Sequence, residues 1–118
     1  MVAATEIRLN KAERILHVEF DDGSSYALPA EYLRVESPSA EVQGHGPDQK
    51  QVVPGKRRVA IVGIEPVGNY AVRLIFDDRH DTGIYSWEHL RELGREYDTR
   101  WKSYLVGLEV KGMNRDRG

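Results

Sequence analysis

The sequence predicts an α+β domain that is mainly β, in which antiparallel hairpins form a small sheet or sandwich and two short helices follow. Alternating apolar and polar residues on either side of a turn signal occur twice, at residues 7–28 and 59–76. This pattern is typical of β-hairpins. Apolar residues at helical spacing are concentrated after residue 86. Strands first and helices last favour an α+β fold with an antiparallel sheet.

The first hairpin is expected within residues 7–28. Its apolar side chains alternate with other residues and so share one face of each strand: Ile7, Leu9, Leu16, Val18 and Phe20. Gly23 follows two aspartates and can take the positive φ that a tight turn needs. Residues 25–28 continue as the returning strand, and a short helical turn follows over residues 30–34.

The second hairpin follows a long polar connection. Residues 36–56 are punctuated by proline and glycine, and structureless loops beyond about 12–15 residues are uncommon and often functional. Strand character returns at residues 59–64, and Gly68-Asn69 supplies the next turn. The strand after it carries an alternating apolar face: Tyr70, Val72, Leu74 and Phe76.

Two helices are expected near the end of the chain. Ser86 is a suitable N-cap for the first, with Gly94 at its end, and Asp98 could cap the second. The apolar stripes are Trp87, Leu90 and Leu93 on the first helix, and Trp101, Tyr104, Leu105 and Leu108 on the second. We assign residues 1–110 to a single domain. Residues 111–118 are polar and glycine-bounded, which predicts a flexible tail.

The composition excludes several classes of protein. The chain has 118 residues, the size of one domain, and no cysteine, so disulfides and thiolate metal sites are absent. A net charge of -2 favours neither nucleic acid nor an anionic membrane. The first residues do not resemble a signal peptide, and no apolar run reaches the roughly 18 residues of a membrane span. We therefore expect a cytoplasmic protein that binds neither nucleic acid nor membranes.

Common catalytic motifs are also absent. The sequence has no G-x-S-x-G elbow, no thiol nucleophile and no H-E-x-x-H zinc helix. Gly55-Lys56-Arg57 lacks the first glycine and the following Ser or Thr of a phosphate-binding loop. The short basic run Lys56-Arg57-Arg58 is more simply explained as a solvated cluster than as a nucleic-acid site. The sequence therefore predicts a protein that is not a self-sufficient enzyme.

The four histidines differ in their surroundings. His17 falls on the polar face of its strand, and His89 lies off the apolar stripe of its helix, so both are expected at the surface. His45 lies between two glycines, which allow the backbone to approach a ligand closely. His80 is the strongest candidate, because neighbouring aspartates such as Asp81 could fix its tautomer as in a metal site. The alternative is that His80 only caps a turn by bonding to a backbone carbonyl.

Two blocks of sequence resemble a known family. Residues 80–90, HDTGIYSWEHL, and residues 37–46, SPSAEVQGHG, are similar to signatures of the gamma-butyrobetaine hydroxylase-like N-terminal domain family, including its bacterial stand-alone members. Tyr32-Leu33-Arg34 matches as well. The resemblance extends from about Ile7 to Leu108.

The resemblance implies a metal site that this chain has altered. In the hydroxylase branch the domain precedes an iron- and 2-oxoglutarate-dependent catalytic domain and holds a structural zinc through three cysteines and one histidine. The histidine corresponds to His80, and the cysteines correspond to Ser37, Ser39 and Val42. Serine hydroxyls are poor zinc ligands and valine is none. We therefore expect the family's zinc site to be absent.

Two functions remain open. The first is a non-catalytic accessory or protein-interaction domain, which the resemblance links to iron–sulfur or iron-dependent oxygenase biology because similar domains are fused to Mrp-type ATPases. It would have no metal cofactor, its partner would be an unidentified protein, and self-association is left open. Trp87 would be either core or a partly exposed anchor. The expected interaction surface consists of Ser37, Ser39, Glu41, His45, His80, Tyr85 and Trp87.

The alternative is a residual metal-binding module. His80 and His45, with a carboxylate from Glu41 or Asp81, would bind a divalent cation such as zinc or iron. Three nitrogen and oxygen ligands suffice in principle for zinc.

Overall fold

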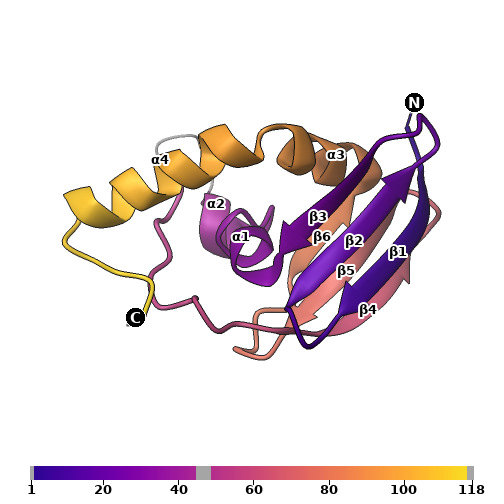
Figure 1. The fold of residues 1–118 in the computed structure, drawn as a ribbon. Coiled ribbons are helices and arrows are strands. Elements are labelled where there is room, and N and C mark those ends of the chain that lie inside the picture. The colour runs from indigo at the N-terminus through magenta and orange to yellow at the C-terminus, as the bar shows by residue number, and fades with distance from the viewer. Residues whose placement is uncertain (1, 45–48, 117–118) are drawn as a thin grey trace.

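The computed structural model describes residues 2–44 and 49–116. Within them the chain forms two three-stranded antiparallel sheets, which lie one behind the other in Figure 1. The first sheet has the order β1-β2-β3 and the second the order β4-β5-β6. The strands are β1 (Ala4–Asn10), β2 (Ile15–Phe20), β3 (Ser25–Pro29), β4 (Ile61–Val67), β5 (Ala71–Phe76) and β6 (Gly83–Ser86). The predicted α+β class and both hairpins are confirmed.

The registers explain which side chains meet in the core. In the first sheet Leu16 lies opposite both Leu9 and Leu28, and all three belong to one face because paired residues point the same way. In the second sheet Leu74 lies opposite Ile64. Leu16, Leu28 and Leu74 are at most 1% exposed. The two apolar faces join one core that also includes residues of the helices.

Four helices lie beside the sheets in the described part of the chain: α1 (Ala30–Val35), α2 (Ala40–Gln43), α3 (Trp87–Arg95) and α4 (Tyr97–Val110). Ser86 caps α3 as predicted, because its Oγ accepts a hydrogen bond from the backbone N–H of His89 at 3.1 Å. Gly94 lies inside α3 rather than after it, where a Cβ would come within 2.3 Å of the Tyr26 ring. This glycine lets α3 pack closely against β3.

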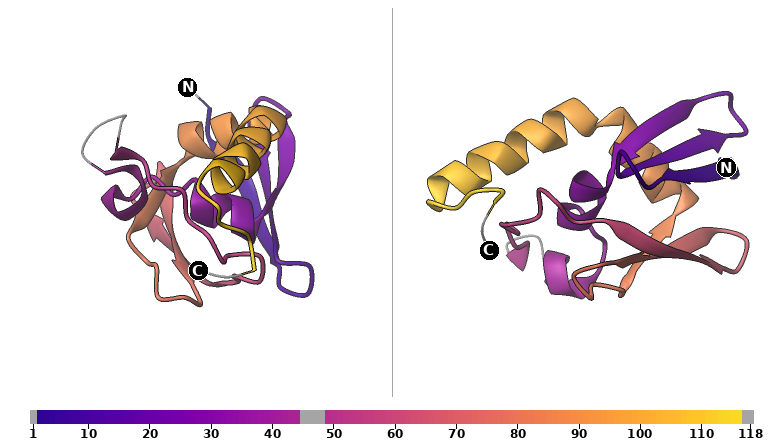
Figure 2. Two further views of the ribbon diagram at one scale, coloured as in Figure 1. Left: turned by 90° about the vertical axis from the view of Figure 1, so that its left-hand side faces the viewer. Right: turned by 60° about the horizontal axis from the view of Figure 1, so that its bottom comes forward.

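The second of the two longer helices differs from its prediction at its start and along its apolar stripe. α4 begins at Tyr97, directly after α3, with no side-chain cap, so Asp98 is not the capping residue. The helix extends beyond the sheets (Figures 1 and 2). Tyr104 and Leu108 are buried against Val35 and residues 52–53. Leu105 was expected on this apolar stripe, but it is 39% exposed and does not belong to this cluster.

The described parts of the polar connection and of the tail form a short helix and several hydrogen bonds. Residues 36–56 contain α2, and the backbone N–H of Gln51 donates to Val42 O at 2.7 Å. The described part of the tail, to residue 116, is held by hydrogen bonds such as Gly55 N–H to Asn114 O at 3.0 Å. Arg115 forms two hydrogen bonds with the buried carboxylate of Glu31, at 2.6 and 2.8 Å. The flexibility of residues 111–118 stays a prediction.

We expect Tyr32→Phe to lower the free energy of unfolding by about 1–2 kcal/mol, because it leaves a buried carbonyl without its donor. The Tyr32 hydroxyl donates to Leu93 O at 2.7 Å and links α1 to the end of α3. Urea unfolding measures the change. The matched control is Tyr70→Phe, whose side chain is 56% exposed and which should change stability little. Equal effects of the two substitutions would contradict this role for Tyr32.

Candidate functional site

His80 lies in the turn between β5 and β6. The turn is closed by the backbone N–H of Phe76, which donates to His80 O at 3.0 Å. Arg79 takes φ 71°, a left-handed conformation that reverses the chain just before the histidine. The backbone N–H of His80 donates to Asp78 Oδ1 at 3.1 Å. These bonds turn the imidazole inward, where His80 is 3% exposed.

The segment that follows α1 provides the other side of the site. Helix α1 ends where Glu36 N–H donates to Tyr32 O at 3.0 Å. Ser39 then caps the short helix α2, since its Oγ accepts from the backbone N–H of Glu41 at 3.1 Å. This cap places the Glu41 side chain on the first turn of α2.

Five side chains meet here, and we call them the His80 cluster. Ser37 Oγ lies 2.8 Å from His80 Nε2, and Glu41 Oε1 lies 2.8 Å from His80 Nδ1. Ser39 Oγ lies 2.6 Å from the Oγ1 of Thr82. The cluster joins residues that are 39 to 43 positions apart in the sequence. It consists of Ser37, Ser39, Glu41, His80 and Thr82.

The hydrogen-bond partners define the tautomer of His80. A carboxylate can only accept, so Nδ1 carries the proton and donates to Glu41. Nε2 then accepts from the Ser37 hydroxyl. The oxygen of Ser37 in turn accepts from the backbone N–H of Ser39 at 3.2 Å. Each polar atom in this series of hydrogen bonds has a partner that suits a neutral imidazole.

Burial is the main reason that the pKa of His80 lies below its ordinary value of 6.5, and the positive charge of Arg34 adds to the effect. The hydrogen bond and charge of Glu41 oppose the shift. The unfolded chain therefore takes up this proton first on acidification. The stability that the neutral ring contributes is present at neutral pH and is lost as the pH falls below about 6.5.

A second charged group supports the turn. Asp78 Oδ2 lies 2.8 Å from Arg34 Nε and 2.7 Å from Lys56 Nζ. Burial disfavours the charge of Asp78, but the hydrogen bonds from Lys56, Arg34 and the His80 N–H outweigh it and lower its pKa to about 2. The carboxylate thus stays ionised at neutral pH and ties α1 to the turn.

The order Ser37, His80, Glu41 has the connectivity of a serine-hydrolase triad. A nucleophile must reach a substrate, and Ser37 is 0% exposed. Gly83 packs over it so closely that a Cβ there would lie 2.6 Å from Ser37 Oγ. The one exposed side chain of the three is the carboxylate, at 61%. In this structure the serine oxygen has no room for a carbonyl carbon, so the arrangement does not match a working triad.

The donor set also does not fit the zinc of the related domains. Ser37 and Ser39 offer neutral hydroxyls that are already hydrogen-bonded, and Val42 offers no donor. Across residues 2–44 and 49–116, no group of three or more His, Asp or Glu side chains is placed to hold a metal ion. His45 lies outside the described residues.

The residues expected to form an interaction surface separate into two groups. Ser37, Ser39, His80 and Tyr85 are buried, so a partner cannot contact their side chains in this conformation. The Tyr85 hydroxyl donates to Leu33 O and closes the end of α1. The prediction of a surface is corrected for these four. Glu41 remains exposed, and the half-buried Trp87 contacts the core while its Nε1 donates to Asn69 O at 2.8 Å.

Three further side chains differ from what the sequence indicated. Asp81 is turned toward Arg73, at 3.5 Å, so the carboxylate beside His80 is that of Glu41. His89 is half-buried rather than solvated, and its Nε2 has no partner among the described residues. Burial lowers its pKa. Thr82 also belongs to the cluster through its contact with Ser39, although the sequence analysis did not single it out. It lies two positions after His80, just before β6.

The fold and the cluster together define a class: a small α+β domain with a buried histidine that is enclosed by hydrogen bonds. The chain belongs to the gamma-butyrobetaine hydroxylase-like N-terminal domain family, whose model matches residues 7–91. No curated protein matches the chain. Nor does the described part of the chain contain a helix long and apolar enough to cross a membrane.

Solved structures of similar proteins cover most of the chain. Two NMR solution structures share 46% and 44% sequence identity, with TM-scores of 0.85 and 0.86. They match 100% and 99% of this chain and 93% and 87% of their own. A crystal structure from Acidithiobacillus ferrooxidans, of a protein of unknown function in the DUF971 family, shares 43% identity with a TM-score of 0.65. It covers 77% of this chain and 91% of its own.

We expect Glu41→Gln to lower the pKa of His80 further, because the substitution removes the negative charge beside Nδ1. The pKa is measured from the NMR shift of the imidazole ring during a pH titration. Asp81→Asn is the matched control, since this neighbouring carboxylate faces Arg73. A larger change with Asp81→Asn than with Glu41→Gln would contradict the assignment.

Proposed function

We propose that the chain is a non-catalytic accessory domain that binds another protein. The observation that carries this proposal is the closure of the His80 cluster. Both ring nitrogens are engaged inside the protein, and the Ser37 hydroxyl beside the ring is fully buried. The cluster therefore supports a structural use, in which it fastens α2 and the segment after α1 to the β5–β6 turn.

The family to which the chain belongs supports a second part of the proposal, the area of biology in which the chain acts. Its relatives link the domain to iron-dependent oxygenases and to iron–sulfur ATPases, and we infer that this chain serves the same area of biology. A cytoplasmic location remains a prediction from the cysteine-free sequence.

The contact surface that we propose lies at the end of the second sheet. Tyr70 and Trp87 are neighbours there, because Trp87 N–H donates to Tyr70 O at 2.9 Å. Tyr70 is 56% exposed, and Trp87 is half-buried. Tyrosine and tryptophan are enriched among the residues that dominate binding energy in protein interfaces. This aromatic pair takes the place of the buried side chains that the sequence indicated.

The experiment that tests this surface is affinity capture from the source cells, with quantitative mass spectrometry. We expect Tyr70→Ser to reduce the recovery of the specific partner about tenfold, as the loss of about 1.4 kcal/mol of binding energy would. The control variant is Val110→Ser, which removes a side chain that is 79% exposed on α4. A partner recovered equally by Tyr70→Ser and the unaltered protein would rule out this surface.

One observation favours a second candidate, the residual metal module. Glu41 lies beside His80, so two potential ligands are already adjacent. Under our proposal, untagged protein contains far less than one metal ion per chain by mass spectrometry. Zinc or iron near one per chain, lost in His80→Gln and in His45→Gln, would support the metal module and overturn the view that the cluster is purely structural.

A further inference from the structure

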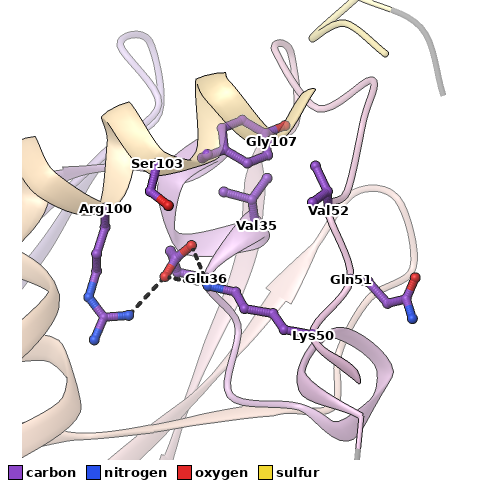
Figure 3. A pocket seen from close by; sticks show the side chains of 9 residues that line it. Val35, Glu36, Lys50, Gln51, Val52, Arg100, Ser103 and Gly107 are labelled. Carbon is purple, nitrogen blue, oxygen red and sulfur yellow. Dashed lines mark hydrogen bonds and ion pairs between the residues drawn. The ribbon is translucent and has the colours of Figure 1, made fainter. Parts of the chain in front are cut away.

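A cavity of about 260 Å³ opens between the end of α1, helix α4 and residues 50–52 (Figure 3). It is separate from the His80 cluster, although the two sites share a segment. Glu36 faces the cavity, while the next residue, Ser37, faces His80. Binding of a ligand in this cavity would therefore not depend on the function proposed above.

The charges of the cavity are unequal. Glu36 is only 3% exposed, and two cations reach its carboxylate. Lys50 Nζ lies 2.9 and 3.0 Å from its two oxygens, and Arg100 Nη1 lies 2.8 Å from Oε1. The three charged side chains of the lining, Glu36, Lys50 and Arg100, carry one positive charge in excess. Glu96, which lies outside the lining, pairs with Arg100 at 2.8 Å and offsets that charge.

Hydrogen-bond donors remain for a ligand. A guanidinium has five N–H groups, and the described contacts of Arg100 engage its Nε and Nη1 only. The Lys50 side chain is 40% exposed, so its ammonium is accessible from the solvent. The exposed residue Ser103 adds a hydroxyl to the same wall. In Figure 3 Arg100 and Lys50 reach the Glu36 carboxylate from two sides, and Ser103 lies on the helix near them.

The remaining wall is apolar. Val35, Val52 and the ring of Tyr104 line it. Gly107 lets Val52 pack against this side of α4, because a Cβ there would lie 3.3 Å from Val52 Cγ2. Glycine is less favourable than alanine inside a helix, so its presence in α4 is consistent with this close contact.

These features point to a ligand with an anionic head and a short apolar body. A cavity of about 260 Å³ lies just below the roughly 300–1,000 Å³ of typical ligand pockets, so it suits a small molecule. We propose that the cavity binds a small aliphatic carboxylate, whose head contacts Arg100 and Lys50 and whose chain lies along Val35, Val52 and Tyr104.

Glu36 then acts as an internal competitor. Its carboxylate occupies the same cations that the ligand would contact, so the ligand must share or displace them. In a Glu36→Gln variant, the new amide keeps the shape of the side chain and removes the competing charge. Glu36→Gln should therefore strengthen ligand binding severalfold, an increase that nonspecific attraction to the surface would not predict.

The test is an NMR titration of the backbone amides with hexanoate, a small aliphatic carboxylate. We expect saturable shifts confined to residues 35–36, 50–52 and 100–107, and no such shifts with hexanamide, its neutral analogue. N-acetyl-leucinate, added in parallel, represents the carboxylate at the end of a peptide. Tighter binding of this probe would identify a chain terminus as the source of the carboxylate, and tighter binding of hexanoate a free acid.

Two variants complete the test. Lys50→Gln should weaken hexanoate binding at least about threefold, and because this lysine is partly exposed the variant should fold normally. Lys56→Gln is the matched control, since that lysine pairs with Asp78 instead. Equal responses to hexanoate and hexanamide, no saturation by about 10 mM, or an affinity unchanged by Lys50→Gln would each overturn the proposal.

Discussion

The fold depends on a buried imidazole that is hydrogen-bonded at both nitrogens. His80 connects the turn of the second sheet to a helical segment that precedes it by about forty residues, at Ser37 and Glu41. Leaving one buried ring nitrogen without a partner would cost about 1–3 kcal/mol, a large share of the stability of a small domain. The side chains around His80 therefore connect the β5–β6 turn to the segment after α1.

Helix α1 and the residue after it form several long-range polar contacts. Glu31 bonds to Arg115, Arg34 to Asp78, and Glu36 to Lys50 and Arg100. Each buried charge on this helix and just after it has a partner from a distant part of the chain. Buried charges are costly unless they are paired. The pairs therefore favour one arrangement of the tail, α4 and the β5–β6 turn around α1.

The sequence was sufficient for features that are set by local periodicity. The hairpins and the Ser86 cap depend on neighbours within a few residues, and these were predicted. Contacts such as Lys50 to Glu36, or the tail to residue 55, depend on how distant segments meet, and no spacing in the sequence encodes that. The same reason explains the site. The sequence singled out His80 and offered both Glu41 and Asp81 as carboxylates near it, but it could not predict that Glu41 is the one beside the ring.

The chemical groups of the His80 cluster determine how it responds to oxidation. The cluster is made only of hydroxyl, carboxylate, imidazole and amide groups. Thiolates in such a position are open to oxidation to sulfenic acid or disulfide, whereas serine oxygens are not. The His80 cluster therefore contains no sulfur that could be oxidised to sulfenic acid or a disulfide, and its hydrogen bonds do not depend on the redox state of a thiol.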